Sequence, residues 1–168
     1  MAETFKLPCS SYEELIKLFQ AYANTKEGTA LSLDEITQAT GVPRTIVSKN
    51  NGFMVQVGLI TEGNKKAATE TGRALGRAYT SKITDEVERI WKEIIAEVDF
   101  LNRMLSAVRI RNGMDRSSFI NHIIYSSGLK DAKESRAGAG ALIEIFKSVG
   151  VLSGSRQDLC ANLFAGSG

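Results

Sequence analysis

Basic side chains are concentrated between residues 41 and 82, where they could bind a polyanion. This stretch holds seven lysines and arginines but only two acidic residues, whereas the whole chain has a formal net charge of +2. Lysine and arginine attract a phosphate backbone, and each phosphate that they neutralise releases condensed counterions. A solvated, lysine-rich surface is the alternative interpretation. The charge pattern favours contact with nucleic acid over that alternative.

Residues suited to catalysis or metal binding are few and scattered. The single histidine, His122, lies among apolar residues of an expected helix, where a packing role is commoner than a catalytic one. Cys9 and Cys160 are too few and too far apart for a metal knuckle or a disulfide framework. The glycines of residues 137–141 lack the phosphate-loop pattern. We therefore expect no enzyme activity, no metal site and no cofactor.

Local patterns predict the elements that would position the basic block. Ser32 and Glu35 have the spacing of a capping box at the start of a helix. Gly41 is expected to end that helix, and Pro43 suits the first turn of the next one. Residues 62–66 (Glu-Gly-Asn-Lys-Lys) form a turn between two segments that can pair as strands.

The helix that follows Pro43 is expected to have one apolar and one polar side. At 100° per residue, the apolar side contains Val47, Met54 and Val57, flanked by Ile46 and Phe53. The polar side contains Thr45, Ser48, Lys49, Gly52 and Gln56. Asn51 is expected to be partly buried and to need hydrogen-bond partners. Because asparagine and glycine are poor helix formers, residues 50–52 predict a kinked or shortened helix.

The segment from about residue 31 to residue 79 resembles the winged helix-turn-helix domain of bacterial and archaeal transcription regulators. The matching positions are residues 33–36, 41–43, 45–49, 57–60 and 69–75. In DNA-binding members of this fold, the second helix of the motif contacts base edges in the major groove. The resemblance implies that Thr45, Ser48 and Lys49 would make these contacts. It implies that phosphates would be contacted by Arg44, Lys65, Lys66 and Arg73. The same fold also serves as a protein-interaction module.

One long helix is expected over residues 83–110. Apolar residues recur there at alternating spacings of four and three, which is a heptad seam formed by Val87, Trp91, Ile94, Val98, Leu101, Leu105 and Val108. A seam of this kind has to be covered by another element or chain. We expect part of it to pack on the preceding unit and part to form a homodimer.

The last third of the chain repeats features of the first. Residues 145–152 align without a gap with residues 53–60, and both segments contain a Val-Gly pair where a helix is expected to end. Residues 117–125 predict a short helix that stops at Gly128. Asp131 and Glu134 are expected to cap a helix that runs to Val149. The small residues 137–141 of that helix favour close packing over contact with bases.

Together these patterns predict a mainly α fold with small β-hairpin wings, arranged as a tandem winged helix-turn-helix joined by a long helix. The expected parts are an N-terminal winged-helix domain at 1–80, a connecting and dimerisation helix at 83–110, and a degenerate second winged-helix domain with a flexible tail at 111–168. The expected function is binding of double-stranded DNA, as a transcription regulator or chromatin-associated factor. The alternative is a tandem winged-helix module that binds proteins and has no direct nucleic-acid role.

The sequence also predicts the cellular compartment of the protein. No apolar run approaches the length of a membrane span, and the first residues lack the pattern of a secretory signal. We therefore expect a cytoplasmic protein with no membrane partner.

Overall fold

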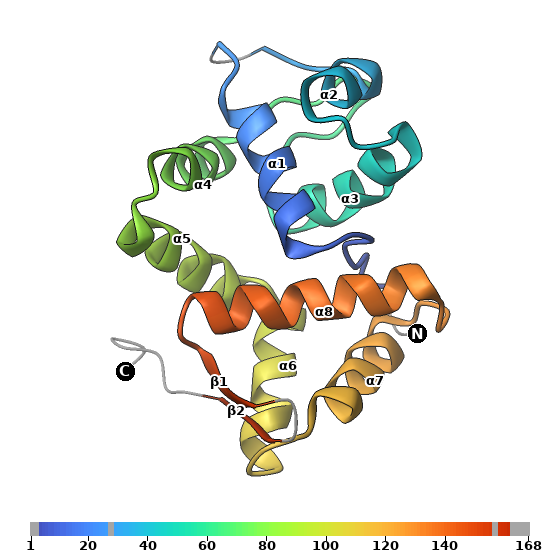
Figure 1. The fold of residues 1–168 in the computed structure, drawn as a ribbon, viewed down its shortest axis with the longest axis vertical. Helices are drawn as coiled ribbons and strands as arrows, with labels where there is room; N and C mark the ends of the chain where they lie inside the picture. Colours follow the sequence, from blue (N-terminus) through green and yellow to red (C-terminus); the bar gives the residue numbers. More distant parts are fainter. Residues whose placement is uncertain (1–3, 27–28, 156–157, 162–168) are drawn as a thin grey trace.

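The structure is a computed structural model that describes residues 4–26, 29–155 and 158–161. Within these ranges the chain is mainly helical, with eight helices and one antiparallel pair of strands (Figure 1). The helices are α1 (Tyr12–Ala23), α2 (Leu33–Thr40), α3 (Arg44–Gln56), α4 (Glu70–Ser81), α5 (Thr84–Glu97), α6 (Asp99–Ile110), α7 (Arg116–Ser127) and α8 (Lys133–Ser148). The strands are β1 (Leu152–Ser155) and β2 (Asp158–Ala161), with Leu152 opposite Ala161. The predicted mainly α fold with a small hairpin is confirmed, and the expected flexible tail lies outside the described residues.

Several helix ends lie where the sequence predicts them. In the capping box of α2, the backbone N–H of Glu35 donates to Ser32 Oγ at 3.2 Å, and the N–H of Ser32 donates to Glu35 Oε1 at 3.0 Å. Gly41 and Gly128 end α2 and α7 with φ of 76° and 77°. These values lie in the left-handed region, which glycine enters without a steric penalty.

The predicted cap of α8 is wrong. The residue that precedes this helix is Ala132, and its N–H donates to Ser135 Oγ at 2.9 Å. Asp131 instead accepts a hydrogen bond from the guanidinium of Arg136 at 2.9 Å. The buried Ser135 hydroxyl therefore takes the part that Asp131 and Glu134 were expected to share.

Two parts of the chain have the same order of elements. In the first unit (residues 12–68), α1 is followed by Leu31, α2, α3 and the hairpin segment 60–68. Within that segment Ile60 pairs with Ala68, and Leu31, which precedes α2, pairs with Lys66. The predicted turn at 62–66 is confirmed by this pairing. In the second unit (residues 99–161), α6 is followed by Met114, α7, α8 and the β1–β2 hairpin, and Met114 pairs with Leu159.

The ends of α3 and α8 have the same geometry, as the aligned residues 53–60 and 145–152 predict. Gly58 and Gly150 have φ of 81° and 79°. The N–H of Leu59 donates to the carbonyl of Met54 at 2.9 Å, and the N–H of Val151 donates to that of Phe146 at 3.1 Å. Each helix thus turns through a left-handed glycine into an extended segment.

The expectation of one helix over residues 83–110 is wrong. Val98 has φ of −90° and ψ of 105°, an extended conformation that separates α5 from α6. The break contains neither glycine nor proline. Tertiary packing accounts for it, because α5 lies against α4 whereas α6 lies against β2 and α7. The two halves of the heptad seam therefore serve different neighbours.

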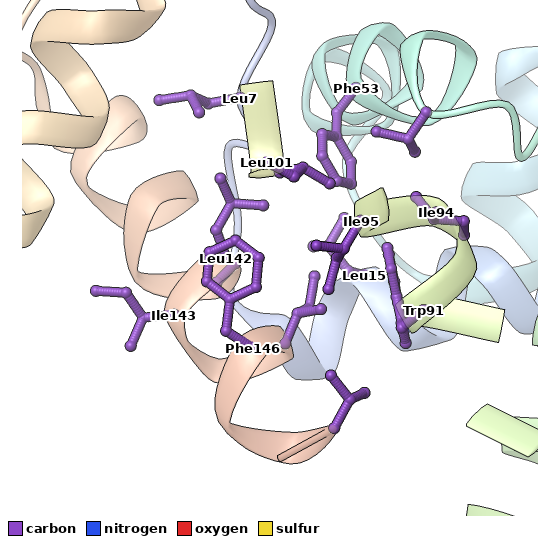
Figure 2. Packing of buried hydrophobic residues seen from close by; sticks show 14 of the residues in the cluster. Leu7, Leu15, Phe53, Trp91, Ile94, Ile95, Leu101, Leu142, Ile143 and Phe146 are labelled. Atoms are coloured by element: carbon purple, nitrogen blue, oxygen red, sulfur yellow. The ribbon is translucent and has the colours of Figure 1, made fainter. Parts of the chain in front are cut away.

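The seam is covered by the chain itself. Six of its residues are buried in the core, namely Val87, Trp91, Ile94, Leu101, Leu105 and Val108, and Val98 is half-buried. Figure 2 shows Trp91, Ile94 and Leu101 among core side chains of other elements. The proposal of a homodimer through this seam is therefore corrected, because these side chains are not available to a second copy.

One core extends across both units, and α8 lies at its centre. In Figure 1, α8 crosses the molecule with α1 and α3 on one side and with α6, α7 and the hairpin on the other. Its Leu142 and Phe146 lie close to Leu15 of α1 and Ile95 of α5 (Figure 2). Within the described ranges, no helix is both long and apolar enough to cross a membrane.

Candidate nucleic-acid interface

The N-terminal half of α3 presents polar side chains to solvent. Arg44, Thr45, Ser48 and Lys49 are exposed, whereas Val47 on the opposite side is fully buried. The side chain of Arg44 keeps 64% of its surface accessible. The predicted division of this helix into an apolar and a polar side is confirmed for these residues. The result is a short polar face at the positive end of a helix dipole.

A groove runs beside this face and connects it to the first hairpin segment. Its volume is about 670 Å³, and its lining includes Ser48 and Gln56 of α3 and Glu62 and Lys66 of segment 60–68. The structure thus brings Ser48 and Lys66 to one depression. The Lys66 ammonium donates to the carbonyl of Gly63 at 2.8 Å, so part of its hydrogen-bonding capacity is used within the turn.

Arg44 and Lys65 lie close to the acidic first turn of α2. The Arg44 guanidinium is 3.6 Å from the carboxylate of Asp34, and both side chains are largely exposed. The pKa of Glu35 is lowered, first by hydrogen bonds from Ser32 and to a smaller extent by the charge of Lys65. Exposed ion pairs are weak, so a phosphate can displace the Asp34 carboxylate from Arg44 at little cost.

Two more of the predicted contact residues, Lys49 and Arg73, also have partners inside the molecule. The Lys49 ammonium donates to Glu134 Oε2 on α8 at 2.5 Å, and this hydrogen bond raises the pKa of Lys49. The Arg73 guanidinium on α4 donates to the carbonyls of Thr25 at 3.0 Å and Ala23 at 3.4 Å. Arg73 therefore holds the C-terminal end of α1, and the structure places it in a stabilising role away from the α3 face.

The C-terminal half of α3 is covered by the N-terminal segment, residues 4–10. Lys6 and Gln56 exchange two hydrogen bonds of 3.3 and 3.4 Å between backbone and side-chain amide. Asn50, which is fully buried, accepts from the N–H of Cys9 at 2.8 Å and donates to Ser10 Oγ at 2.8 Å. Asn50 was missed as a buried anchor, although a pair of asparagines inside a helix is a weak sign of buried polar contacts.

Asn51 is buried, as expected, but the helix continues past it. The hydroxyl of Tyr22 donates to Asn51 Oδ1 at 3.0 Å, and α3 continues to Gln56. Burial raises the pKa of Tyr22 to about 12, so its hydroxyl keeps its proton and remains a donor at neutral pH. Among the described residues the amide nitrogen of Asn51 has no hydrogen-bond partner. The expected shortening is therefore wrong, because tertiary packing keeps α3 one continuous helix through a sequence of poor propensity.

The helix of the second unit that corresponds to α3 differs in what it buries. The corresponding helix, α8, buries Gly138, Ala139 and Ala141, which confirms the predicted packing role for these three residues, whereas Ala137 is exposed. A Cβ atom at Gly138 would lie 1.8 Å from the carbonyl oxygen of Pro8, so the N-terminal segment passes directly over this glycine.

Several basic residues of the second unit are paired with acids. Arg103 binds Asp99 at 2.8 Å, and Arg116 binds Glu144 at 3.2 Å. The pKa of His122 is lowered, first by burial and then by the charges of two nearby arginines. Within the described part of the chain, no group of three or more His, Cys, Asp or Glu side chains is placed to hold a metal ion.

Comparison of the chain with protein-family models, with curated proteins and with solved structures finds no match.

Proposed function

We propose that the chain binds double-stranded DNA through its first unit, as a transcription regulator or chromatin-associated factor. The supporting observation is the exposed polar face of α3 beside the groove that α3 shares with segment 60–68. The first unit has the order α1, the paired residue Leu31, α2, α3 and the hairpin segment 60–68, which fits a winged helix-turn-helix. In that motif the second helix, here α3, enters the major groove. The repeat of that order in the second unit supports a tandem arrangement.

The side chains divide by role within this proposal. Thr45 and Ser48 are short, exposed and on the outward side of α3, so they contact base edges. Arg44 and Lys65 contact phosphates after leaving their exposed carboxylate neighbours. Lys49 adds a further contact when it separates from Glu134. The second unit serves to hold the N-terminal segment and α3 in place.

Titration of a random-sequence duplex of about 20 base pairs, followed by fluorescence anisotropy, tests the proposal. If three phosphates are neutralised, the affinity falls about 40-fold between roughly 50 and 200 mM salt. Failure to bind at the lower salt concentration contradicts the proposal. An affinity that is indifferent to salt contradicts it as well.

A protein-interaction module is the second candidate, and one observation favours it. Residues 6–10 already lie along the C-terminal half of α3, held by Asn50 and Gln56. That half of the helix therefore behaves as a surface that receives an extended peptide. Co-purification with one protein that resists added salt, together with no binding to duplex DNA, would support this candidate over the first.

A further inference from the structure

A pocket of about 440 Å³ lies where the N-terminal segment, α3 and the connection between α7 and α8 meet. Its volume is within the usual range of small-molecule sites, about 300–1,000 Å³. Its apolar wall includes Leu7 and Pro8 from the N-terminal segment and Leu129 and Ala132 from the α7–α8 connection. The pocket adjoins the groove beside segment 60–68, and Lys6, Ser48 and Gly52 border both.

The charged residues of this pocket are mostly basic. Lys6, Lys49 and Lys130 line it, against the single carboxylate of Glu134. The Lys49 ammonium binds that carboxylate at 2.5 Å, and both side chains are about half exposed. The pocket therefore already holds one carboxylate beside an apolar wall, and two further lysines remain to attract an anion.

The remaining reactive group of the pocket is not poised for covalent chemistry. Burial raises the pKa of the Cys9 thiol to about 11, so the thiol stays protonated at neutral pH. Its Sγ lies 3.6 Å from the carbonyl oxygen of Ile46, to which it donates. Because the thiolate is the nucleophilic form, a neutral thiol suits a binding site better than a reactive one.

We propose that this pocket binds a small apolar carboxylic acid. The carboxylate of the ligand replaces Glu134 at the Lys49 ammonium, and its hydrocarbon chain lies against Leu7, Pro8 and Leu129. Charge complementarity selects an anion over a neutral or cationic molecule of the same length. The site does not depend on DNA binding, so it can be tested on the full chain alone.

Calorimetric titration with octanoate, octan-1-ol and octylammonium tests the selectivity. All three probes have the same hydrocarbon chain, so the apolar contribution is shared and the head group decides the order. We expect octanoate to bind most tightly and octylammonium to bind most weakly. If octylammonium binds as well as octanoate, the proposal is overturned.

Substitutions of the charged pair test the assigned position. Glu134→Gln removes the competing carboxylate and should tighten octanoate binding about threefold. Lys49→Met removes the partner and should weaken it about fivefold to tenfold, whereas Lys17→Met, an exposed lysine of α1 outside the pocket, leaves it unchanged. Equal octanoate affinity in Glu134→Gln, Lys49→Met and the unaltered chain overturns the proposal.

A bulky side chain tests the location without changing charge. Ala132→Trp places an indole at the wall of the pocket and should abolish octanoate binding, whereas Ala96→Trp adds the same group to an exposed position of α5. Octanoate binding by Ala132→Trp at the unaltered affinity would place the acid elsewhere and overturn the proposal. The substitutions at Lys49 and Glu134 retain their force if Ala132→Trp does not fold.

Discussion

The third helices of the two units, α3 and α8, occupy equivalent places in the element order but lie in opposite environments. Both end through a left-handed glycine that leads into a hairpin. The first half of α3 faces solvent with basic and hydroxyl side chains, whereas the middle of α8 is covered by α1, the N-terminal segment and its own unit. Similar local sequences thus produce the same helix ends, and the surrounding side chains decide whether a helix can meet a partner.

This difference divides the proposed roles between the units. A recognition helix needs exposed donors and acceptors that are free to bind, which α3 provides at Thr45 and Ser48, whereas the exposed Glu134 and Arg136 of α8 are paired with Lys49 and Asp131. A helix at the centre of a core needs small residues where other segments cross it, which α8 provides at Gly138 and Ala139. In this account the second unit acts as the support on which the first presents its α3 face.

The largest expected effect comes from adding one methyl group to the covered middle of α8. Gly138→Ala would place Cβ 1.8 Å from the carbonyl oxygen of Pro8, so the N-terminal segment has to move away from α8. We expect the free energy of unfolding to fall by about 3 kcal/mol or more, measured by urea denaturation.

Two matched glycines sharpen this prediction. Gly140→Ala, on the same helix, meets only the guanidinium of Arg116 at 3.2 Å. Gly52→Ala, on α3, meets the flexible side chain of Lys6 at 2.9 Å. Both should change the free energy of unfolding by no more than about 1 kcal/mol, because helix propensity offsets the small displacement. An equal loss at Gly138 and Gly52 would contradict the contrast between the helices.

A smaller loss is expected when the N-terminal segment loses its anchor on α3. Asn50→Ala leaves the N–H of Cys9 and the hydroxyl of Ser10 without their partner in a buried site. The expected fall in the free energy of unfolding is about 2 kcal/mol. Gln56→Ala removes two long, exposed hydrogen bonds to Lys6 and should cost less than about 0.5 kcal/mol. A result in the reverse order would mean that Gln56, and not Asn50, fixes the segment.

The smallest expected effect concerns the ion pair between the two helices. Glu134→Gln separates Lys49 of α3 from α8, but both side chains are about half exposed. We therefore expect the free energy of unfolding to change by less than about 1 kcal/mol in thermal or urea denaturation. A loss of several kcal/mol would show that this contact locks the units together, in which case Lys49 is not free to leave it.

The sequence predicted the elements that depend on local chemistry. The capping box of Ser32 and Glu35, the stops at Gly41 and Gly128 and the turn at 62–66 require only nearby residues, and the structure confirms them. The polar side of α3 was predicted for the same reason, because helical periodicity alone sets it.

The features that failed or were missed depend on tertiary contacts. The heptad seam continues through Val98, yet the helix breaks there because its two halves pack on different elements. The spacing of apolar residues shows that a seam must be covered, but it does not show whether the same chain covers it. The hydrogen-bond partners of Lys49, Arg73 and Asn50 lie 85, 48 and 41 residues away along the chain, respectively. Local sequence patterns do not reach that far.

The most direct test of the central claim compares charge reversal in the two units. Arg44→Glu with Lys65→Glu reverses charge on the α3 face and on segment 60–68, and Arg109→Glu with Lys133→Glu makes the same change in net charge at exposed positions of the second unit. In the duplex titration, we expect the first pair to abolish measurable binding, or to reduce the salt slope by about two where residual binding is measurable. The second pair should keep an affinity within about threefold of the unaltered chain, since it loses only long-range attraction. Equal losses in both pairs would contradict the assignment of DNA binding to the first unit.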